Sequence, residues 1–454
     1  MIAGMDPRDN STPMSPMKQV NPFDFFSALL RANSDQVIHM VLYFEGSINP
    51  GTMQRAVKGA VLAEPVCHSR LVEADDTLWW EPQSTVNPAD CFSFLENTGT
   101  DAALYQALSE IIDPYQCPQI KVILIRTIEG KGDVLVINAC HVAMDGRGLK
   151  DIAGLIMELY HHSMEDPSSI TGIIPVLSGD LPLISTFLPP GDGLPWPEEF
   201  SSGAERWTFP VQSHEAHQPA YAVMTIPCPR VAAIHAKRKE LGVTVNDLML
   251  AVVAMACSNL GGGIDPAECS FLTTIDLRRY HQAPLRSVTN YSTAFEVRIP
   301  LEPLDTLSSL CGVVHEIMEN KKNNCPGMKD ALDAERLWNS GVSAARKTLR
   351  TRVMDPDNYE NQIPIVTNTG IIDLGLGNHC TPRIKNACML PCHAPAPAFF
   401  VAISTYKDTM TISSTYHRPA VADEQVRAFF DWINRLLPGY TVSDDQDWLQ
   451  FIPR

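Results

Sequence analysis

The sequence predicts an α/β (α+β) fold of two lobes, and three observations support this prediction. The chain has 454 residues, more than a single hydrophobic core usually holds. Apolar segments of strand length alternate with segments of helical spacing on both sides of residues 173–204. That central stretch is dense in Pro and Gly, which excludes long helices and favours an extended connection between the lobes.

These patterns divide the chain into four parts. Residues 1–19 are polar and rich in Pro, Ser and Met, and we expect a disordered leader there. Residues 20–172 form the expected N-terminal lobe, residues 173–204 the Pro/Gly-rich crossover, and residues 205–454 the expected C-terminal lobe.

A hairpin followed by a helix is the clearest local prediction in the first lobe. The apolar runs 121–125 and 134–139 flank a Gly-Lys-Gly turn, a pattern typical of two paired strands. After the second run, apolar side chains recur at helical spacing: Leu149, Ile152, Ala153, Ile156 and Tyr160.

The second lobe is expected to open with a strand at 220–226 and a helix at 230–241. Thr244 and Asp247 have the spacing of a capping box, which predicts that another helix begins there. The apolar run 248–257 in that helix is shorter than the ~20 residues that span a bilayer, so we expect a buried helix.

Composition excludes some functions. The chain carries 35 Lys and Arg against 52 Asp and Glu, a formal charge of −17, whereas nucleic-acid binding requires a basic face. Twelve cysteines are scattered without a Cys-x-x-Cys pair, and no signal-like segment precedes them. We therefore expect reduced thiols, a cytoplasmic protein without a membrane span, and no nucleic-acid partner.

The most informative motif is His141-Val-Ala-Met-Asp145-Gly146, which directly follows the second strand of the expected hairpin. A histidine at the mouth of a loop held by a strand and a helix is well placed for catalysis. Its unperturbed pKa of ~6.5 suits a general base near neutral pH.

The His-x-x-x-Asp-Gly spacing resembles the active-site motif of the acyltransferases related to chloramphenicol acetyltransferase. This superfamily includes peptide condensation domains, alcohol and polyketide-associated acyltransferases, and wax ester synthases. Many members carry two adjacent histidines, and here Cys140 replaces the first of them while His141 keeps the position of the base.

The resemblance extends over about residues 20–440, because further segments occur in the family's order. Residues 24–70 are similar to the family's opening strand, helix and strand, and residues 244–251 to its helix-opening Asn-Asp segment. The remaining similar segments are Thr-Ile-Asp-Leu-Arg-Arg at 274–279, Asn-Tyr-Ser at 290–292 and Thr-Asn-Thr-Gly at 367–370.

The resemblance implies two chloramphenicol-acetyltransferase-like lobes with mixed, largely antiparallel sheets and a tunnel between them that holds His141 at its middle. It also implies that Asp145 forms a salt bridge with a distant arginine, for which Arg278 fits best and Arg279 second. From the residues alone, Asp145 could instead cap the helix near Gly148. Both roles would make Asp145 a residue that shapes the site.

Several groups are candidate hydrogen-bond donors to an oxyanion. Gly146 would let its backbone approach a thioester carbonyl closely or adopt a positive φ, and its N–H could hold the oxyanion. Asn290, Ser292 and Thr293 are possible further contacts with the oxyanion or the substrate, although such a turn is commonly only structural.

A metal centre is not expected. The stretch from His379 to His393 contains suitable residue types, but their spacings match no familiar zinc pattern and apolar strands surround them. Cys140 is not expected to pair with His141, because neighbouring side chains on a strand point to opposite faces.

The resemblance leaves three functions open. The first is an acyltransferase that moves an acyl group from a thioester to a hydroxyl or amine, with His141 as general base and no cofactor. Because no adenylation or carrier segment accompanies the lobes, acyl-coenzyme A is favoured as donor. The second is a free-standing condensation enzyme that works with an acyl carrier protein, and the third is a non-catalytic, condensation-like binding module.

Overall fold

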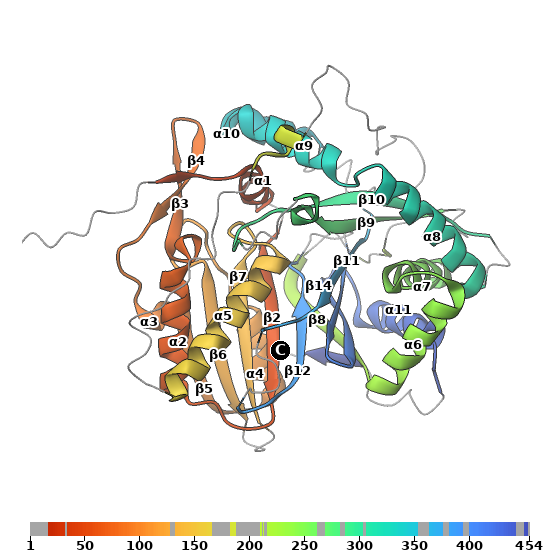
Figure 1. Ribbon diagram of the computed structural model, residues 1–454, viewed down its shortest axis with the longest axis horizontal. Coiled ribbons are helices and arrows are strands. Elements are labelled where there is room, and N and C mark those ends of the chain that lie inside the picture. Colours follow the sequence, from red (N-terminus) through yellow and green to blue (C-terminus); the bar gives the residue numbers. More distant parts are fainter. Residues whose placement is uncertain are drawn as a thin grey trace, which may run out of the picture.

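A computed structural model describes residues 17–31, 34–127, 132–165, 182–187, 209–210, 212, 216–260, 268–281, 287–302, 306–352, 363–375, 381–393, 399–441 and 449–452. These residues form two lobes that lie side by side (Figure 1). Each lobe contains a mixed sheet with helices packed on it, which confirms the predicted fold class.

The first lobe contains a five-stranded sheet in the order β12-β2-β7-β6-β5. Only β5 and β6 run parallel, so the sheet is largely antiparallel, as expected. The predicted hairpin is present as β6 and β7. The strands are β2 (Val37–Phe44), β5 (Phe92–Thr98), β6 (Ile120–Thr127), β7 (Asp133–Cys140) and β12 (Ile384–Leu390).

Helices cover both faces of this sheet. The main core of the lobe packs one face against α2 (Pro50–Ala63) and α5 (Gly146–Glu165), the latter being the helix predicted after the motif. A smaller core joins the other face to α4 (Thr100–Leu108) and to strands of the second lobe. Alternation along β2 explains this division, because Met40 and Leu42 point into the first core and Val41 into the second.

A small three-stranded sheet lies beside this lobe, in the order β1-β4-β3. Its strands are β1 (Lys18–Gln19), β3 (Ser69–Ala74) and β4 (Thr77–Pro82). The short elements η1 (Pro65–His68) and α3 (Pro88–Cys91) complete the described part of the lobe.

The second lobe is built on a seven-stranded sheet in the order β10-β9-β11-β13-β14-β8-β15. Strand β11 pairs in parallel with β9 and β13, and the other pairs are antiparallel. The strands are β8 (Ala216–Ile226), β9 (Glu268–Asp276), β10 (Ser292–Pro300), β11 (Ile365–Ile371), β13 (Phe400–Tyr406), β14 (Thr409–Pro419) and β15 (Leu449–Ile452).

Four helices pack on this sheet: α6 (Cys228–Leu241), α7 (Val245–Leu260), α8 (Leu307–Asn323) and α11 (Asp423–Leu436). The predicted capping box opens α7, since the Asp247 backbone N–H donates to the Thr244 hydroxyl and the Thr244 N–H to the Asp247 carboxylate. The apolar run of α7 is buried in the core, as expected. Within the described residues, no single helix has the length and apolarity to cross a membrane.

The second half of the chain also builds part of the first lobe. Strand β12 adds to the edge of the first sheet beside β2, although its residues fall in the stretch expected to form the second lobe alone. Helix α10 (Val342–Arg352) buries Val342 and Leu349 in the first core, while α1 (Pro22–Leu30) and α9 (Met328–Asn339) contribute to both cores. The lobes are therefore not two consecutive pieces of sequence.

Two of the expected segments are only partly described. In the expected leader 1–19, residues 1–16 lie outside the described residues, whereas Lys18–Gln19 form β1 and pair with β4, so these residues are ordered. Of the crossover 173–204, the described part is 182–187, which contains the short helix η3 (Ile184–Phe187).

Candidate active site

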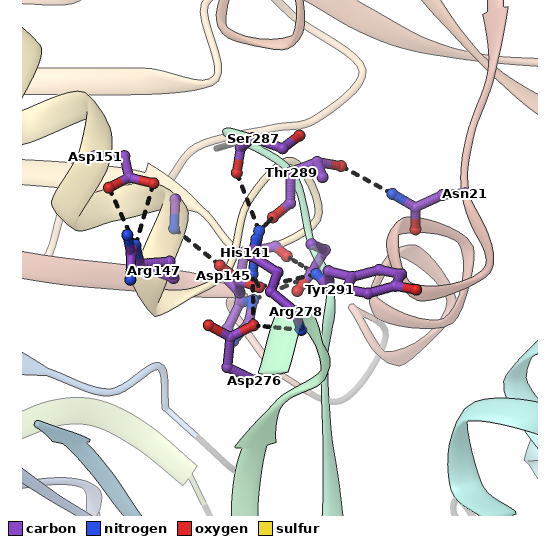
Figure 2. A network of polar contacts seen from close by, with 12 residues as sticks. Asn21, His141, Asp145, Arg147, Asp151, Asp276, Arg278, Ser287, Thr289 and Tyr291 are labelled. Carbon is purple, nitrogen blue, oxygen red and sulfur yellow. Dashed lines mark hydrogen bonds and ion pairs between the residues drawn. The ribbon is translucent and has the colours of Figure 1, made fainter. Parts of the chain in front are cut away.

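His141 is the first residue after β7 and lies at the junction of the two lobes (Figure 2). Its backbone N–H donates to the Gln36 carbonyl at 2.6 Å, which extends the pairing of β7 with β2 by one residue. The backbone N–H groups of Ala143 and Met144 then donate to the Cys140 carbonyl and close a tight turn before α5. The sequence thus places His141 between a strand and a helix, as predicted.

The second lobe contacts His141 through Asn290. The Asn290 side-chain amide donates to the His141 carbonyl and to the Ser27 hydroxyl, and its nitrogen lies 3.5 Å from His141 Nδ1. Both N–H groups of this amide therefore have partners within the protein. Asn290 thus holds the backbone of His141 in this structure, and its predicted contact with an oxyanion or substrate stays a prediction.

The surroundings of His141 favour a neutral imidazole. Burial lowers the pKa of this side chain below its usual value, and this effect outweighs hydrogen bonds to the backbone of His141 and Met144 and the charge of Asp145, which act in the opposite direction. The side chain nevertheless remains partly exposed. A neutral, accessible imidazole can accept a proton.

Asp145 is buried and uses both carboxylate oxygens (Figure 2). One oxygen, Oδ1, accepts the backbone N–H of Gly148 at 2.9 Å, in the first turn of α5. The other, Oδ2, accepts from Nη1 of Arg278 at 2.7 Å and from the backbone N–H of Tyr291 at 2.8 Å. The two roles that the sequence left open, helix cap and ion-pair partner, are therefore both present.

Arg278 is buried and completes the network. It lies in the short helix η4 (Leu277–Tyr280), which follows β9 in the second lobe. Besides Asp145, its guanidinium binds the Asp276 carboxylate at 3.0 Å and donates to the carbonyls of Ser287 and Thr289 at 3.0 and 2.8 Å. The alternative partner Arg279 is exposed, so the structure selects Arg278.

Electrostatics keep this pair ionised. Burial alone would raise the pKa of Asp145, but the charge of Arg278 and three hydrogen bonds outweigh it, and the pKa lies below its usual value. In turn, the carboxylates of Asp145 and Asp276 raise the pKa of Arg278 against the effect of burial. An ion pair with hydrogen bonds on every carboxylate oxygen holds the 141–145 turn to the second lobe.

Gly146 begins α5 and its φ is not positive, which excludes one of the two predicted reasons for a glycine and leaves the close approach to a thioester as a prediction. A Cβ there would lie 3.5 Å from Met389 Cε, an ordinary contact. The more tightly packed glycine of this segment is Gly148. A Cβ on Gly148 would lie 3.0 Å from Met144 Cβ and 3.5 Å from the backbone of Val288 and Thr289.

Ser292 and Thr293 are the first residues of β10, directly after Tyr291. A Cβ added at Gly327 would meet the methyl group of Thr293 at 2.6 Å, so this methyl faces α9. The oxyanion role of Ser292 and Thr293 stays a prediction.

The cysteines near the motif are buried thiols. Burial raises the pKa of Cys140, Cys388 and Cys392 to about 12, so none of them is a thiolate near neutral pH. His393 binds Asp35, while His379 and Cys380 lie outside the described residues. Among the side chains that the structure describes, no group of three or more has an arrangement that could hold a metal ion.

A cavity of about 630 Å³ opens at the far end of the first sheet, lined by residues that include Tyr43, Thr100, Thr127, Asp133 and Lys385. Asp133 is the first residue of β7, and His141 follows its last. At ~3.3 Å per residue, the whole length of this strand separates the cavity from the imidazole. The cavity is therefore not the space in which His141 acts.

Sequence reasoning missed several residues that hold the site. The Tyr291 N–H binds Asp145 and the Gln36 carbonyl binds the N–H of His141. Both are backbone groups, so the residue types at these positions do not reveal the contacts. Gly148 stands in the motif segment, and its proximity to Asp145 was the only available signal. Ser27 reaches Asn290 from α1, far away in the sequence.

Comparison with known proteins identifies relatives only through structure. No protein family and no curated protein matches the sequence. The solved structures that share the fold include three at 12–14% identity. The trichothecene 15-O-acetyltransferase TRI3 from Fusarium sporotrichioides has a TM-score of 0.68 over 93% of this chain and 94% of its own.

The first condensation domain of the CDA synthetase has a TM-score of 0.65 and covers 95% of this chain and 99% of its own. The SgcC5 protein from Streptomyces globisporus has a TM-score of 0.58, with 94% and 95% covered. The chain thus has the two-lobed fold of acetyltransferases and condensation domains over nearly its whole length. This confirms the resemblance that the motifs indicated, at the level of the fold.

Proposed function

We propose that this protein is an acyltransferase that moves an acyl group from an acyl thioester to a hydroxyl or amine, with His141 as general base. The observation that carries the proposal is the buried ion pair between Asp145 and Arg278. It fixes the turn of His141 against the other lobe, at the junction of the two lobes. Together with the neutral, partly exposed imidazole of His141, this rigid attachment supports a role for His141 as a base.

The proposed reaction needs no covalent intermediate. The neutral imidazole of His141 accepts the proton of the acceptor's hydroxyl or amine as its oxygen or nitrogen attacks the thioester carbonyl. The tetrahedral intermediate then collapses with cleavage of the C–S bond, and the thiol leaves with the proton. Asp145 is not the base, because both of its oxygens already accept hydrogen bonds.

The oxyanion of the tetrahedral intermediate needs hydrogen-bond donors. We assign this role to the backbone N–H of Gly146 at the start of α5, where the helix dipole also favours negative charge. Ser292 and Thr293 stay candidates for further contacts. The reaction draws on no metal or bound cofactor in this proposal.

For the donor we favour acyl-coenzyme A and for the acceptor a hydroxyl. The support is the likeness to an enzyme described as a 15-O-acetyltransferase, which shares the fold over almost its whole length. A second candidate is a condensation enzyme that takes its acyl group from a carrier protein, supported by the likeness to a condensation domain. Both functions would use His141 in the same way.

The test is a panel of acyl-coenzyme A donors of increasing chain length, each with and without sets of alcohols and amines. Release of free thiol is measured alongside mass spectrometry of the acylated product. We expect acceptor-dependent thiol release that is lost in His141→Ala. A parallel set with acyl groups loaded on a carrier protein distinguishes the second candidate.

The outcomes separate the hypotheses. Thiol release with coenzyme A donors supports the first function, and release only from the carrier protein supports the condensation enzyme. If ligands bind but no donor yields a product in the wild-type protein, the chain is a non-catalytic binding module. Equal rates in wild type and His141→Ala would contradict the assignment of the base.

A further inference from the structure

A second histidine, His393, is connected to His141 through a short turn of the first lobe. His393 follows β12 and is fully buried at the junction of the lobes, 5.0 Å from the ring of Tyr221 between ring centroids. Its Nδ1 lies 2.9 Å from Oδ2 of Asp35. This pair lies outside the network of Asp145 and Arg278, and the proposed reaction makes no use of it.

The turn at residues 34–37 is clamped on His393 by several hydrogen bonds. The backbone N–H of His393 donates to Asp35 Oδ1 at 3.2 Å, and the Ser34 hydroxyl donates to the His393 carbonyl. Asp35 Oδ1 also accepts the Val37 N–H at 3.2 Å, where β2 begins. The Ser34 hydroxyl accepts the Gln36 N–H at 3.4 Å.

This clamp holds Gln36 in an unusual conformation. The residue is buried and its φ is +51°, in the left-handed region that residues with a side chain rarely adopt. Such a conformation persists only when the surrounding structure fixes it. In this conformation the Gln36 carbonyl accepts the backbone N–H of His141 at 2.6 Å.

The charge of Asp35 suits its role in the clamp. Burial would raise its pKa, but hydrogen bonding to His393 and the neighbouring imidazoles outweigh this effect and lower it. The carboxylate is thus ionised near neutral pH, and charge-assisted hydrogen bonds are stronger than neutral ones. The contacts run from His393 through Asp35 and Gln36 to the backbone of His141.

We propose that His393 and Asp35 are positioning residues, which set the orientation of the His141 imidazole through the carbonyl of Gln36. This inference rests on the proposed function, because it names a further part of the same site. It assigns to β12, the strand that the second half of the chain adds to the first lobe, a direct role in placing the base.

The central variant is His393→Leu, which removes the side-chain donor to Asp35. His393→Asn is the conservative partner, because its amide nitrogen can take the place of Nδ1. The matched control is His39→Leu: His39 is equally buried beside Tyr221 and acts on Asp35 through its charge, but its Nδ1 lies 2.8 Å from the Asn138 side chain and is hydrogen-bonded there rather than to the turn. Each variant is checked for wild-type folding by circular dichroism and thermal melting.

In the acyl-transfer assay, we expect His393→Leu to lower kcat at least tenfold with a KM within threefold of wild type. A base displaced by ~1 Å loses rate, whereas substrate contacts elsewhere are kept. The acid limb of the pH profile of kcat/KM should move towards the ordinary histidine pKa, because a loosened turn admits water to His141. His393→Asn should regain most of kcat, and His39→Leu should keep kcat and the pH profile.

A second readout is independent of the activity. Diethyl pyrocarbonate acylates accessible imidazoles, and mass spectrometry of the peptide that contains His141 gives its rate of modification. We expect this rate to rise at least threefold in His393→Leu but not in His39→Leu. If the wild-type protein transfers no acyl group at all, the proposed function fails, and this measurement still decides whether His393 positions His141.

Wild-type kcat and an unchanged modification rate in a folded His393→Leu protein would overturn the proposal. The same losses in His39→Leu would also overturn it, since they would reflect general loosening of the junction. If His393→Leu does not fold, Ser34→Ala takes its place. It removes one hydroxyl of the clamp, and we expect at least a threefold loss of kcat, with wild-type values counting against the proposal.

Discussion

At the scale of single residues, Asp145 meets two structural demands with one carboxylate. One oxygen caps the first turn of α5, and the other binds Arg278 and the backbone N–H of Tyr291 in the other lobe. A shorter or neutral side chain could satisfy the cap but not the charge of the buried guanidinium. Asp145 thus links a local interaction to a contact between lobes, which explains why a residue that does not face the reaction belongs to the motif.

The first prediction concerns the base. His141→Ala should lower kcat by about 10²–10⁴-fold with little change in melting temperature, because only the proton acceptor is lost. In the wild-type protein, kcat/KM should fall as pH drops through a pKa below 6.5, since burial lowers the pKa of His141 and its protonated form cannot act. Steady-state kinetics between pH 5 and 8 check both points.

Cys140→Ala is the neighbouring control for this prediction. Its thiol is buried and protonated, so the variant should keep most of the activity. A much larger loss in Cys140→Ala than in His141→Ala would contradict the assignment of the base.

The second prediction concerns Asp145. Asp145→Asn should lower the free energy of unfolding by about 3 kcal/mol, because Arg278 would lose its buried counter-charge and keep only the partly exposed carboxylate of Asp276. Since folding lowers the pKa of Asp145, its stabilising contribution is complete above its ordinary pKa of 3.8 and is lost as pH falls through the lower folded value. Chemical denaturation of the variant and of wild type measures the difference.

The double variant Asp145→Asn/Arg278→Met separates the two possible roles of this carboxylate. Removing both charges should recover part of the stability that Asp145→Asn loses. A variant Asp145→Asn that unfolds like wild type but has no activity would show that the carboxylate takes part in the chemistry.

At the scale of elements, the contact between α5 and the segment at 287–290 sets the position of the His141–Gly146 motif relative to the second lobe. A Cβ on Gly148 would lie 3.0 Å from Met144 Cβ and would already contact the backbone of Val288 and Thr289 at 3.5 Å, so side-chain atoms beyond a Cβ would have to displace this segment. On the other side of the motif, β7 and the 34–37 turn fix the His141 backbone. The turn that contains His141 is thus held by the start of a helix, the end of a strand and a segment of the other lobe.

The third prediction follows from this packing. Gly148→Val should lower kcat about 10- to 100-fold and reduce the free energy of unfolding by about 1–3 kcal/mol, because the added methyl groups push α5 away from residues 288 and 289. Kinetics and thermal melting measure the two effects. Gly146→Ala is the control for size at a neighbouring helical position, where a Cβ has an ordinary contact only.

We expect Gly146→Ala to fold with wild-type stability. Equal stability and activity of Gly148→Val and wild type would mean that the contact between α5 and the other lobe does not place His141.

At the scale of the whole molecule, the two lobes exchange elements. Strand β12 comes from the second half of the chain but pairs with β2, and α10 packs in the first core. Without β12, the apolar strand β2 would become an exposed edge, which favours aggregation. The lobes therefore depend on each other for folding as well as for the site between them.

The fourth prediction tests this dependence. A fragment of residues 17–187 should be insoluble or lack fixed tertiary packing, whereas co-expression with residues 209–454 should restore a compact complex. Size-exclusion chromatography and near-ultraviolet circular dichroism of both preparations check the prediction. A first fragment that unfolds cooperatively by itself would contradict it.

The sequence by itself determined the local features of this protein. The β6–β7 hairpin, the capping box of α7 and the place of His141 between a strand and a helix follow from residues near each other in the chain. Arg278 was predicted as the partner of Asp145 from the resemblance to the family, because spacing alone could not identify it. Periodicity and turn residues report on local backbone geometry, which is why these predictions agree with the structure.

Only the tertiary structure decided which distant segments meet. The placement of β12 beside β2, the contact of Asn290 with His141 and the path from His393 to Gln36 join residues more than a hundred positions apart. Several of these contacts use backbone N–H and carbonyl groups, which every sequence contains alike. Which of these backbone groups meet depends on how the two cores pack as a whole. A local pattern of side chains therefore cannot predict these contacts.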